Sequence, residues 1–348
     1  MKLSTKPFAI LSAALAVMCA AAPSAAWAEL RVVTTLPAYA SIAQFLGGDR
    51  VIAQAISRGD EDAHFVKPKP SFALMLKQAD LFVTTGLDLE LWAPTLVDKS
   101  GNRGIRDGEP GFVSASAGVV MADVPEAISR EGGDVHVYGN PHIHTSPINA
   151  KTIAANIAAG LERVDPAGAA VYAANLARFQ ERVDASLYGE ELVRLLGSEV
   201  LDPLARDGEL IAFLESKQFE GRPLIDRLGG WLEQALPFRQ AKIVAYHGNW
   251  IYFTQLFGLD VVDFVERKPG IPPSAKHVLE LLETIKSERV EVLLAANYFS
   301  RTQVETIAER SGCTAVIVAL SPMEVSAEGY FELVSNWIES LLGGFGTQ

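Results

Sequence analysis

Short apolar runs alternate with segments of helical periodicity along most of the chain, and this alternation restricts the possible folds more than any other feature. The runs at residues 30–35 and 81–85 have the composition of buried strands. The second half of the chain repeats the rhythm, with strands expected at 242–245, 290–295 and 315–320. Strands that alternate with helices favour a mostly parallel sheet with helices on both faces, so the sequence predicts the α/β class.

A long helix is expected in the middle of the chain. Pro166 is near its first turn, where the missing proline N–H costs nothing, and no glycine or proline follows until Gly189. Apolar residues recur there at three- and four-residue steps, and such a helix could join two lobes. At ~100–200 residues per domain, the length of 348 residues also suggests two domains.

The N-terminus has the layout of a secretory signal peptide. Lys2 and Lys6 precede an apolar segment at 8–22, which leads to an A-x-A cleavage pattern at 26–28. That apolar segment is shorter than the roughly 20 residues needed to cross a bilayer. We expect cleavage after residue 28 and a periplasmic product. Lipid attachment at Cys19 is the less favoured alternative, because that processing prefers a small residue where Met18 stands.

The charge and cysteine content exclude several classes of protein. The formal net charge is −12 at pH 7, which argues against a nucleic-acid partner because such proteins need clustered lysine and arginine. The acidic balance is compatible with a cationic ligand. Only Cys313 remains after cleavage, so a metal site would have to use histidine and carboxylate ligands.

Three of the six histidines occupy positions where an α/β fold binds ligands. His247 lies at the end of an expected strand, His64 follows another on a loop stiffened by Pro68 and Pro70, and His142 precedes a helix. Ligands bind outside the carboxyl ends of strands in open α/β sheets. Three neutral imidazoles suit Zn²⁺, and also copper, nickel or ferrous iron, whereas manganese sites carry more carboxylate oxygen.

The ordered set of motifs resembles the zinc/manganese-type substrate-binding proteins of bacterial ABC metal importers. The matching segments span nearly the whole chain after residue 28, at 31–37, 64–71, 79–81, 86–90, 140–150, 246–259, 269–274 and 308–312. The resemblance implies two α/β lobes, each a mostly parallel sheet flanked by helices, joined by one long rigid helix. It also implies a metal in the cleft between the lobes, with His64 and His142 as ligands from the first lobe and His247 from the second.

These features divide the chain into four expected parts. They are a signal peptide at 1–28, an N-terminal metal-binding lobe at 29–163, a linking helix at 164–200 and a C-terminal metal-binding lobe at 201–348.

The sequence departs from the family pattern around the expected metal. His144 and Ser146 replace an aromatic and an acidic residue that usually follow the second ligand, and Ser321 stands where the family has an acidic fourth ligand. The fourth metal ligand is therefore expected to be Glu324, a water molecule or another group. The missing carboxylate would weaken manganese binding more than zinc binding, so we expect Zn²⁺, with Mn²⁺ or Fe²⁺ less favoured.

Several other residues have two interpretations. His136 and His144 form either an auxiliary capture site or a pair of exposed histidines, and we favour the second. Glu90 either orients a ligand histidine or is a charge at a helix start. The remaining expectations are a core position for Trp92, Trp231 and Trp250, an exposed His277, a solvated turn at 266–268, and Tyr298 as a core residue or a cleft-lining one.

The expected function is capture of a divalent transition metal, zinc above all, by a monomer that delivers it to the membrane permease of an ABC importer without catalysis. A secreted zinc hydrolase is an alternative, because three histidines and a water also form a catalytic arrangement. Against it, the chain has no HExxH helix and no evident paired base. A metal-dependent adhesin of the same fold is the third possibility.

Overall fold

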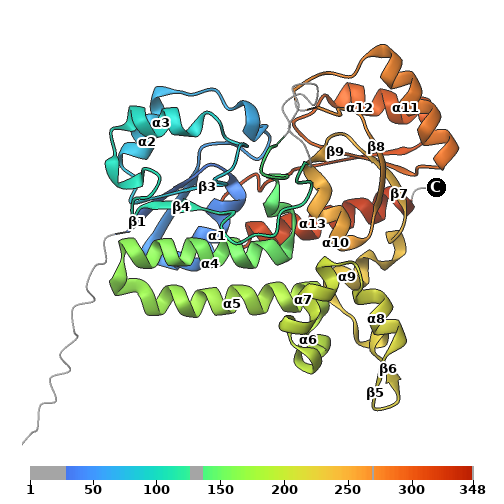
Figure 1. Cartoon of the computed structure of the whole chain (residues 1–348), viewed down its shortest axis with the longest axis horizontal. Helices are drawn as coiled ribbons and strands as arrows, with labels where there is room; N and C mark the ends of the chain where they lie inside the picture. The colour runs from blue at the N-terminus through green and yellow to red at the C-terminus, as the bar shows by residue number, and fades with distance from the viewer. Residues whose placement is uncertain (1–28, 126–135, 269, 347–348) are drawn as a thin grey trace, which may run out of the picture.

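Two α/β lobes stand side by side in the computed structural model, which describes residues 29–125, 136–268 and 270–346 (Figure 1). The expected signal peptide at 1–28 lies outside the described residues. Each lobe is built on a four-stranded parallel sheet, in the orders β2-β1-β3-β4 and β10-β9-β7-β8. Among the described helices, none is long and apolar enough to span a membrane.

The first sheet is covered on both faces at its central strands, which explains why β1 and β3 are mostly apolar. It contains β1 (Leu30–Thr34), β2 (Val51–Ala55), β3 (Leu81–Thr84) and β4 (Phe112–Ser114). Val32 faces a core shared with α1 (Pro37–Gly47) and α4 (Pro147–Val164). Val33 faces a second core with α2 (Pro70–Lys77) and α3 (Ala93–Ser100). Parallel strands enclosed in this way carry no polar face.

The second sheet follows the same plan. Its strands are β7 (Lys242–Ala245), β8 (Asp260–Phe264), β9 (Val292–Ala296) and β10 (Thr314–Val318). Leu294 faces α10 (Ile251–Phe257) and α13 (Gly329–Gly346), whereas Leu293 faces α11 (Ala275–Glu288) and α12 (Arg301–Ser311). The α/β class with two lobes is therefore confirmed.

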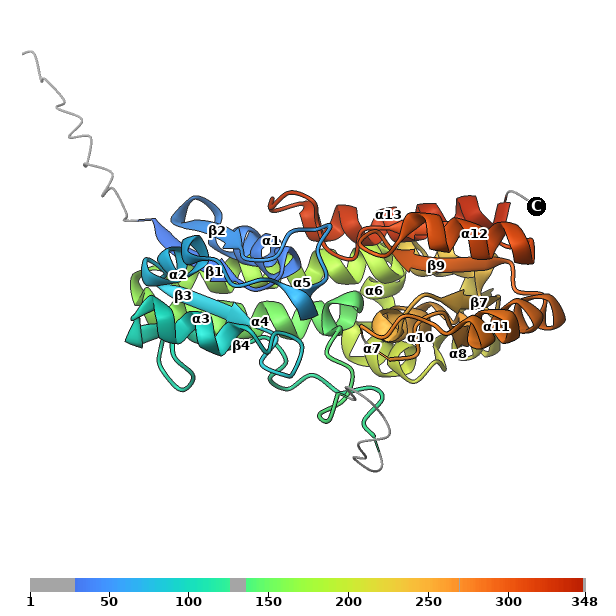
Figure 2. The ribbon, with the colours of Figure 1, turned by 90° about the horizontal axis from the view of Figure 1, so that it is seen from above.

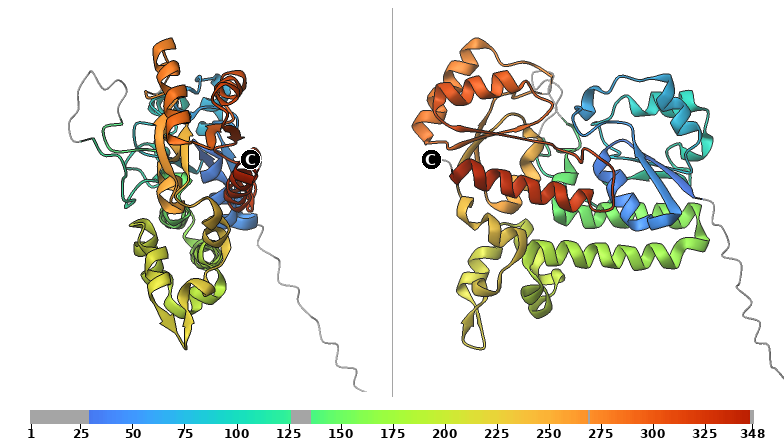
Figure 3. Two further views of the ribbon diagram at one scale, coloured as in Figure 1. Left: turned by 90° about the vertical axis from the view of Figure 1, so that its right-hand side faces the viewer. Right: turned by 180° about the vertical axis from the view of Figure 1, so that it is seen from behind.

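Two helices connect the lobes. The long helix expected after Pro166 is α5 (Ala169–Tyr188), which packs along α4 of the first lobe and against α9 (Gly230–Ala235) beyond it. It ends at Gly189, whose positive φ of 82° breaks the helix, so the rest of segment 164–200 forms α6 (Glu190–Leu196) and the start of α7 (Ser198–Arg206). The C-terminal α13 begins beside α1 of the first lobe and runs from there along the second lobe (Figures 2 and 3).

A small extension hangs below the second lobe in Figure 1. It consists of α7, α8 (Leu210–Ser216) and a hairpin of β5 (Gln218–Phe219) and β6 (Arg222–Pro223). These elements lie away from the upper edge of the lobes, where the loops after β2, β3 and β7 approach one another.

Candidate metal centre

Four imidazole rings come together where the two lobes meet. His64, His142 and His247, the three predicted residues, have ring centroids 5.2 Å (His64–His142), 6.1 Å (His142–His247) and 6.2 Å (His64–His247) apart. His136 joins them, 5.3 Å from His64 and 6.0 Å from His142. The first lobe supplies His64 from a 3-10 helix after β2, together with His136 and His142, and the second supplies His247 just after β7.

Carboxylates orient two of the four rings. Asp62 Oδ1 accepts hydrogen bonds from Nδ1 of His64 at 2.7 Å and from its backbone N–H at 3.0 Å. Asp88 Oδ1 lies 2.9 Å from Nδ1 of His136. An ionised carboxylate can only accept, so Nδ1 of each ring carries a proton, and Nε2 presents a lone pair whenever the ring is neutral.

Neutral carbonyl oxygens orient the other two rings. Oδ1 of Asn140 lies 2.9 Å from Nδ1 of His142, and the backbone carbonyl of Glu266 lies 3.2 Å from Nδ1 of His247. Contacts of this kind to Nδ1 are typical of metal-binding histidines, because they fix the tautomer and the ring direction. All four rings therefore direct Nε2 away from these partners.

The protonation states suit a cation. Burial lowers the pKa of His142 well below its usual value, and the neighbouring His64 and His247 lower it further. Burial also lowers the pKa of His247 to about 4, although its hydrogen bond to the Glu266 carbonyl acts in the opposite direction. Burial acts to raise the pKa of Asp62, but the hydrogen bonds from the ring and backbone of His64, together with the charges of His64 and His247, lower the pKa below its usual value. At neutral pH the rings of His142 and His247 are neutral and Asp62 is ionised.

Hydrogen bonds across the lobes hold the loops that carry the rings. Nδ2 of Asn140 donates to the carbonyl of Gly248, the residue after His247, at 2.7 Å. The hydroxyl of Tyr252 on α10 donates to the carbonyl of Asn140 at 2.6 Å. Asn140 thus orients His142 and ties it to the second lobe.

His136 was expected among exposed histidines, and this prediction is wrong. Its side chain is partly buried, and its ring contacts Asp88, 48 residues earlier in the chain. His144 was misplaced in the same way: it is buried, with only 1% of its surface exposed, and packs edge-on to Tyr39 instead of joining the four rings. Neither histidine belongs to an exposed pair.

The residues considered for a fourth ligand lie at different depths. Ser321 is buried and lines a cavity of about 20 Å³ together with His142, His144 and Tyr298. Tyr298 is therefore a cleft-lining residue. Glu324 is exposed, and no contact between it and the four rings is found among the described residues.

Other interpretations changed as well. Glu90 is buried and accepts hydrogen bonds from Thr35, Thr84 and Thr85, so it does not orient a ligand histidine. Glu266 is buried rather than solvated, because its carboxylate accepts from the backbone of Gly270 while its carbonyl supports His247. His277 is half-buried, with Nε2 close to the carbonyl of Phe264. The three tryptophans are core residues as predicted, and these are Trp92, Trp231 and Trp250.

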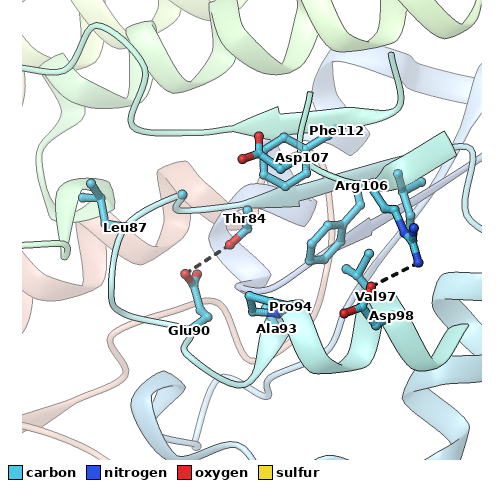
Figure 4. A pocket seen from close by; sticks show the side chains of 13 residues that line it. Thr84, Leu87, Glu90, Ala93, Pro94, Val97, Asp98, Arg106, Asp107 and Phe112 are labelled. Carbon is cyan, nitrogen blue, oxygen red and sulfur yellow. Dashed lines mark hydrogen bonds and ion pairs between the residues drawn. The ribbon is translucent and has the colours of Figure 1, made fainter. Parts of the chain in front are cut away.

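A larger cavity lies elsewhere in the first lobe. It has a volume of about 430 Å³ and is bounded by β3, β4 and α3, with Phe112, Val97 and the Arg106–Asp98 ion pair on its walls (Figure 4). None of the four clustered histidines lines it. A single metal ion needs converging ligands rather than volume, so this larger cavity is not where we expect the ion.

Three buried histidines should make the stability of the metal-free protein depend on pH. Burial lowers the pKa of His142 well below its usual value, and burial lowers the pKa of His144 and of His247 to about 4. The unfolded chain, with histidine pKa values of about 6.5, binds more protons between pH 6.5 and 4. The stabilisation from these groups is therefore fully present above pH 6.5 and is lost as pH falls through that window, by about 3 kcal/mol for each of His144 and His247.

Urea unfolding of metal-free protein between pH 7 and 4.5 measures this loss. The His144→Phe variant should show a shallower pH dependence, because one of the three groups no longer titrates. An unchanged slope in that variant would contradict the assignment of His144 as a buried neutral imidazole.

Comparison with known proteins identifies relatives along nearly the whole chain. The sequence profile described as zinc-uptake complex component A, periplasmic (ZnuA), matches residues 32–187 and 225–344. The iron-binding protein YfeA of Yersinia pestis is 23% identical over 331 residues, covering 93% of this chain and 89% of YfeA. The zinc-binding lipoprotein AdcA of Streptococcus pneumoniae is 22% identical over 318 residues, covering 89% of this chain but only 53% of AdcA. The chain thus spans about half the length of that relative.

A solved structure supports the same grouping at the level of the fold. A crystal structure of ZnuA aligns with a TM-score of 0.65 at 20% sequence identity, covering 91% of this chain and 100% of the other. The profile matches both lobes and most of α5, so it covers well over half of the sequence. The resemblance noted from the motifs is confirmed, and the chain belongs to the ZnuA family of periplasmic components of zinc-uptake complexes.

Proposed function

We propose that this protein captures one divalent transition metal ion, with Zn²⁺ preferred, at His64, His142 and His247, and delivers it to the permease of an ABC importer. One observation carries the proposal: imidazoles from both lobes converge, and each has Nδ1 engaged by an oxygen acceptor, which leaves Nε2 as the nitrogen for a metal. Such a site can close on an ion from two sides. The division into lobes at 29–163 and 201–348, with the linking segment 164–200 between them, is part of the proposal.

The chemistry of the donors supports zinc over manganese. The described groups that face one another across the site are imidazole nitrogens, while Asp62 and Asp88 point at Nδ1 atoms behind two of the rings. Imidazole suits zinc and iron, whereas manganese prefers carboxylate, carbonyl and water oxygens. The relatives are in accord, since one is named as iron-binding and another as zinc-binding.

The proposal also covers the location of the protein, its oligomeric state and the absence of catalysis. Cleavage after residue 28 would release the chain into the periplasm of the cell. One chain supplies rings from both lobes, so a monomer suffices for capture. Binding without catalysis is favoured because Asp62 and Glu266, the carboxylates nearest to the rings of His64 and His247, already accept hydrogen bonds that fix the site.

Metal titration tests the proposal. Purified protein in competition with a chelator should bind Zn²⁺ at one ion per chain, more tightly than Fe²⁺ and far more tightly than Mn²⁺. Elemental analysis of protein from its native compartment should find the same ion. If the protein binds no ion stoichiometrically, the proposal fails. It also fails if the zinc-loaded protein hydrolyses esters or peptides and the His64→Ala variant loses that activity.

A further inference from the structure

The Nε2 atoms of His64 and His136 face each other at a distance of 3.3 Å. Both rings place Nδ1 against an acceptor-only carboxylate, so both carry their proton on Nδ1. When both rings are neutral in this tautomer, their Nε2 lone pairs face each other and no proton lies between them. A cation between the two nitrogens removes that repulsion, because both lone pairs can then point at it.

The distance also matches a specific coordination geometry. Zn–N bonds of about 2.0–2.1 Å in a tetrahedron place neighbouring nitrogens about 3.3–3.4 Å apart, which is the separation of these two Nε2 atoms. The same geometry places ring centroids about 5 Å apart. His64 stands 5.3 Å from His136 and 5.2 Å from His142, whereas His136 and His142 are 6.0 Å apart and His247 lies 6.1 Å from His142 and 6.2 Å from His64. The two pairs that His64 makes within the first lobe thus have the spacing of rings on a common ion, and the other pairs are slightly wider.

Asp88 holds His136 by two contacts. One carboxylate oxygen accepts from Nδ1 of the ring, and the other accepts from the backbone N–H of Val137 at 3.1 Å. Both the ring and the backbone next to it are therefore fixed relative to β3, four residues before Asp88. An exposed surface histidine would need no such support, since water satisfies its ring.

We infer that His136 is the fourth metal ligand, so that the ion bound between the lobes has a closed shell of four imidazole nitrogens. The inference rests on the proposed function and deepens it, because it specifies the class of ion. Four nitrogens complete a tetrahedron and leave no position for a bound water or a carboxylate oxygen. The negative charge that offsets the ion comes from Asp62 and Asp88, one hydrogen bond behind the ligands. Such a shell selects zinc over manganese by ligand type rather than by size.

The decisive experiment counts the imidazoles around the metal. X-ray absorption spectra of the zinc-loaded protein should fit four nitrogens from imidazole, and the His136→Ala variant should fit three with one oxygen from water. The Co²⁺-substituted proteins should show the matching change, from the intense visible bands of a four-coordinate site to weaker bands. His277→Ala serves as the matched control, because His277 lies outside the cluster and contacts the Phe264 carbonyl.

Affinities supply the second readout. We expect His136→Ala to lower the zinc affinity on the order of 100-fold and the manganese affinity much less. The preference of the site for zinc over manganese should therefore be largely lost. Asp88→Asn should retain four imidazoles and lose zinc affinity by about tenfold, as expected for a residue that only positions the ligand.

Two outcomes separate this inference from the proposed function. Three imidazoles in the wild-type spectrum, or unchanged zinc binding in His136→Ala alongside a severe loss in His64→Ala, would overturn the fourth ligand and leave metal capture intact. Unchanged binding in both variants would overturn both.

Discussion

Replacing His247 with alanine is expected to lower the zinc affinity by at least about 100-fold. Metal binding at a structural zinc site is worth about 10–16 kcal/mol, so one ligand in four accounts for about 3 kcal/mol, which is about 100-fold. His247 is the ring from the second lobe in the cluster, and it is buried with Nε2 directed away from the Glu266 carbonyl. Its loss removes the ligand through which the ion holds the lobes together.

Two measurements check this expectation. Chelator competition gives the affinity, and thermal unfolding with and without zinc gives the stabilisation that binding provides, which reaches ~2.7 kcal/mol when free zinc is 100 times the dissociation constant. The His247→Ala variant should lose most of that stabilisation at a zinc concentration that saturates the wild type. His277→Ala, in the same lobe but outside the cluster, should behave as the wild type. Unchanged affinity in His247→Ala would show that the ion binds elsewhere.

The sequence was sufficient for the parts of the protein that are set by local patterns. Strand and helix periods predicted the α/β class, because buried parallel strands are apolar on both faces. The division into two lobes was suggested by the chain length and the long helix, and was implied by the family resemblance. His64, His142 and His247 each stand in a motif of their own at a loop near a sheet edge, which is why they could be identified one at a time. Their use as metal ligands remains a prediction that the converging rings support.

The features that the sequence did not reveal depend on contacts between distant segments. A histidine at position 136 has the same neighbours in the chain whether its ring faces water or the cluster, and only Asp88 from another loop decides between the two. Glu266 lies in a run of charges typical of a solvated turn, yet the fold buries it against His247. The short helices α6 to α9 carry too few turns for a clear period, and Pro203 sits inside one of them.

The Lys151→Met variant is expected to lose about 3–5 kcal/mol of stability, the largest effect that we predict outside the metal centre. Lys151 lies on α4 with 8% of its surface exposed, and its ammonium group pairs with Asp184 on α5 and Asp202 on α7. Asp202 also accepts a hydrogen bond from the hydroxyl of Tyr188. Removing one partner from a buried ion pair leaves an uncompensated charge in a medium that solvates it poorly, and this costs about 3–5 kcal/mol.

Urea unfolding of the metal-free protein measures the loss, and two variants isolate its cause. Lys242→Met breaks an ion pair with Glu288 that is half exposed, so it should change stability by less than about 1 kcal/mol. The triple variant Lys151→Met, Asp184→Asn, Asp202→Asn removes the charges that Lys151→Met leaves unpaired, so it should recover part of the loss. A Lys151→Met variant as stable as the wild type would mean that water reaches the two carboxylates in the folded protein.

The buried ion pairs of Lys151 are connected to the metal centre through the backbone of α4. Helix α4 begins at Pro147, five residues after His142, and the lysine fixes that first turn to α5, the helix that links the lobes. None of the three charged residues contacts the four histidines among the described residues, so the folded variant keeps its ligands. Lys151→Met should therefore bind zinc with nearly wild-type affinity where it is folded, while zinc raises its stability by the same amount as in the wild type. Loss of affinity in a folded Lys151→Met protein would instead show that the position of α4, and not only the four rings, sets the geometry of the metal site.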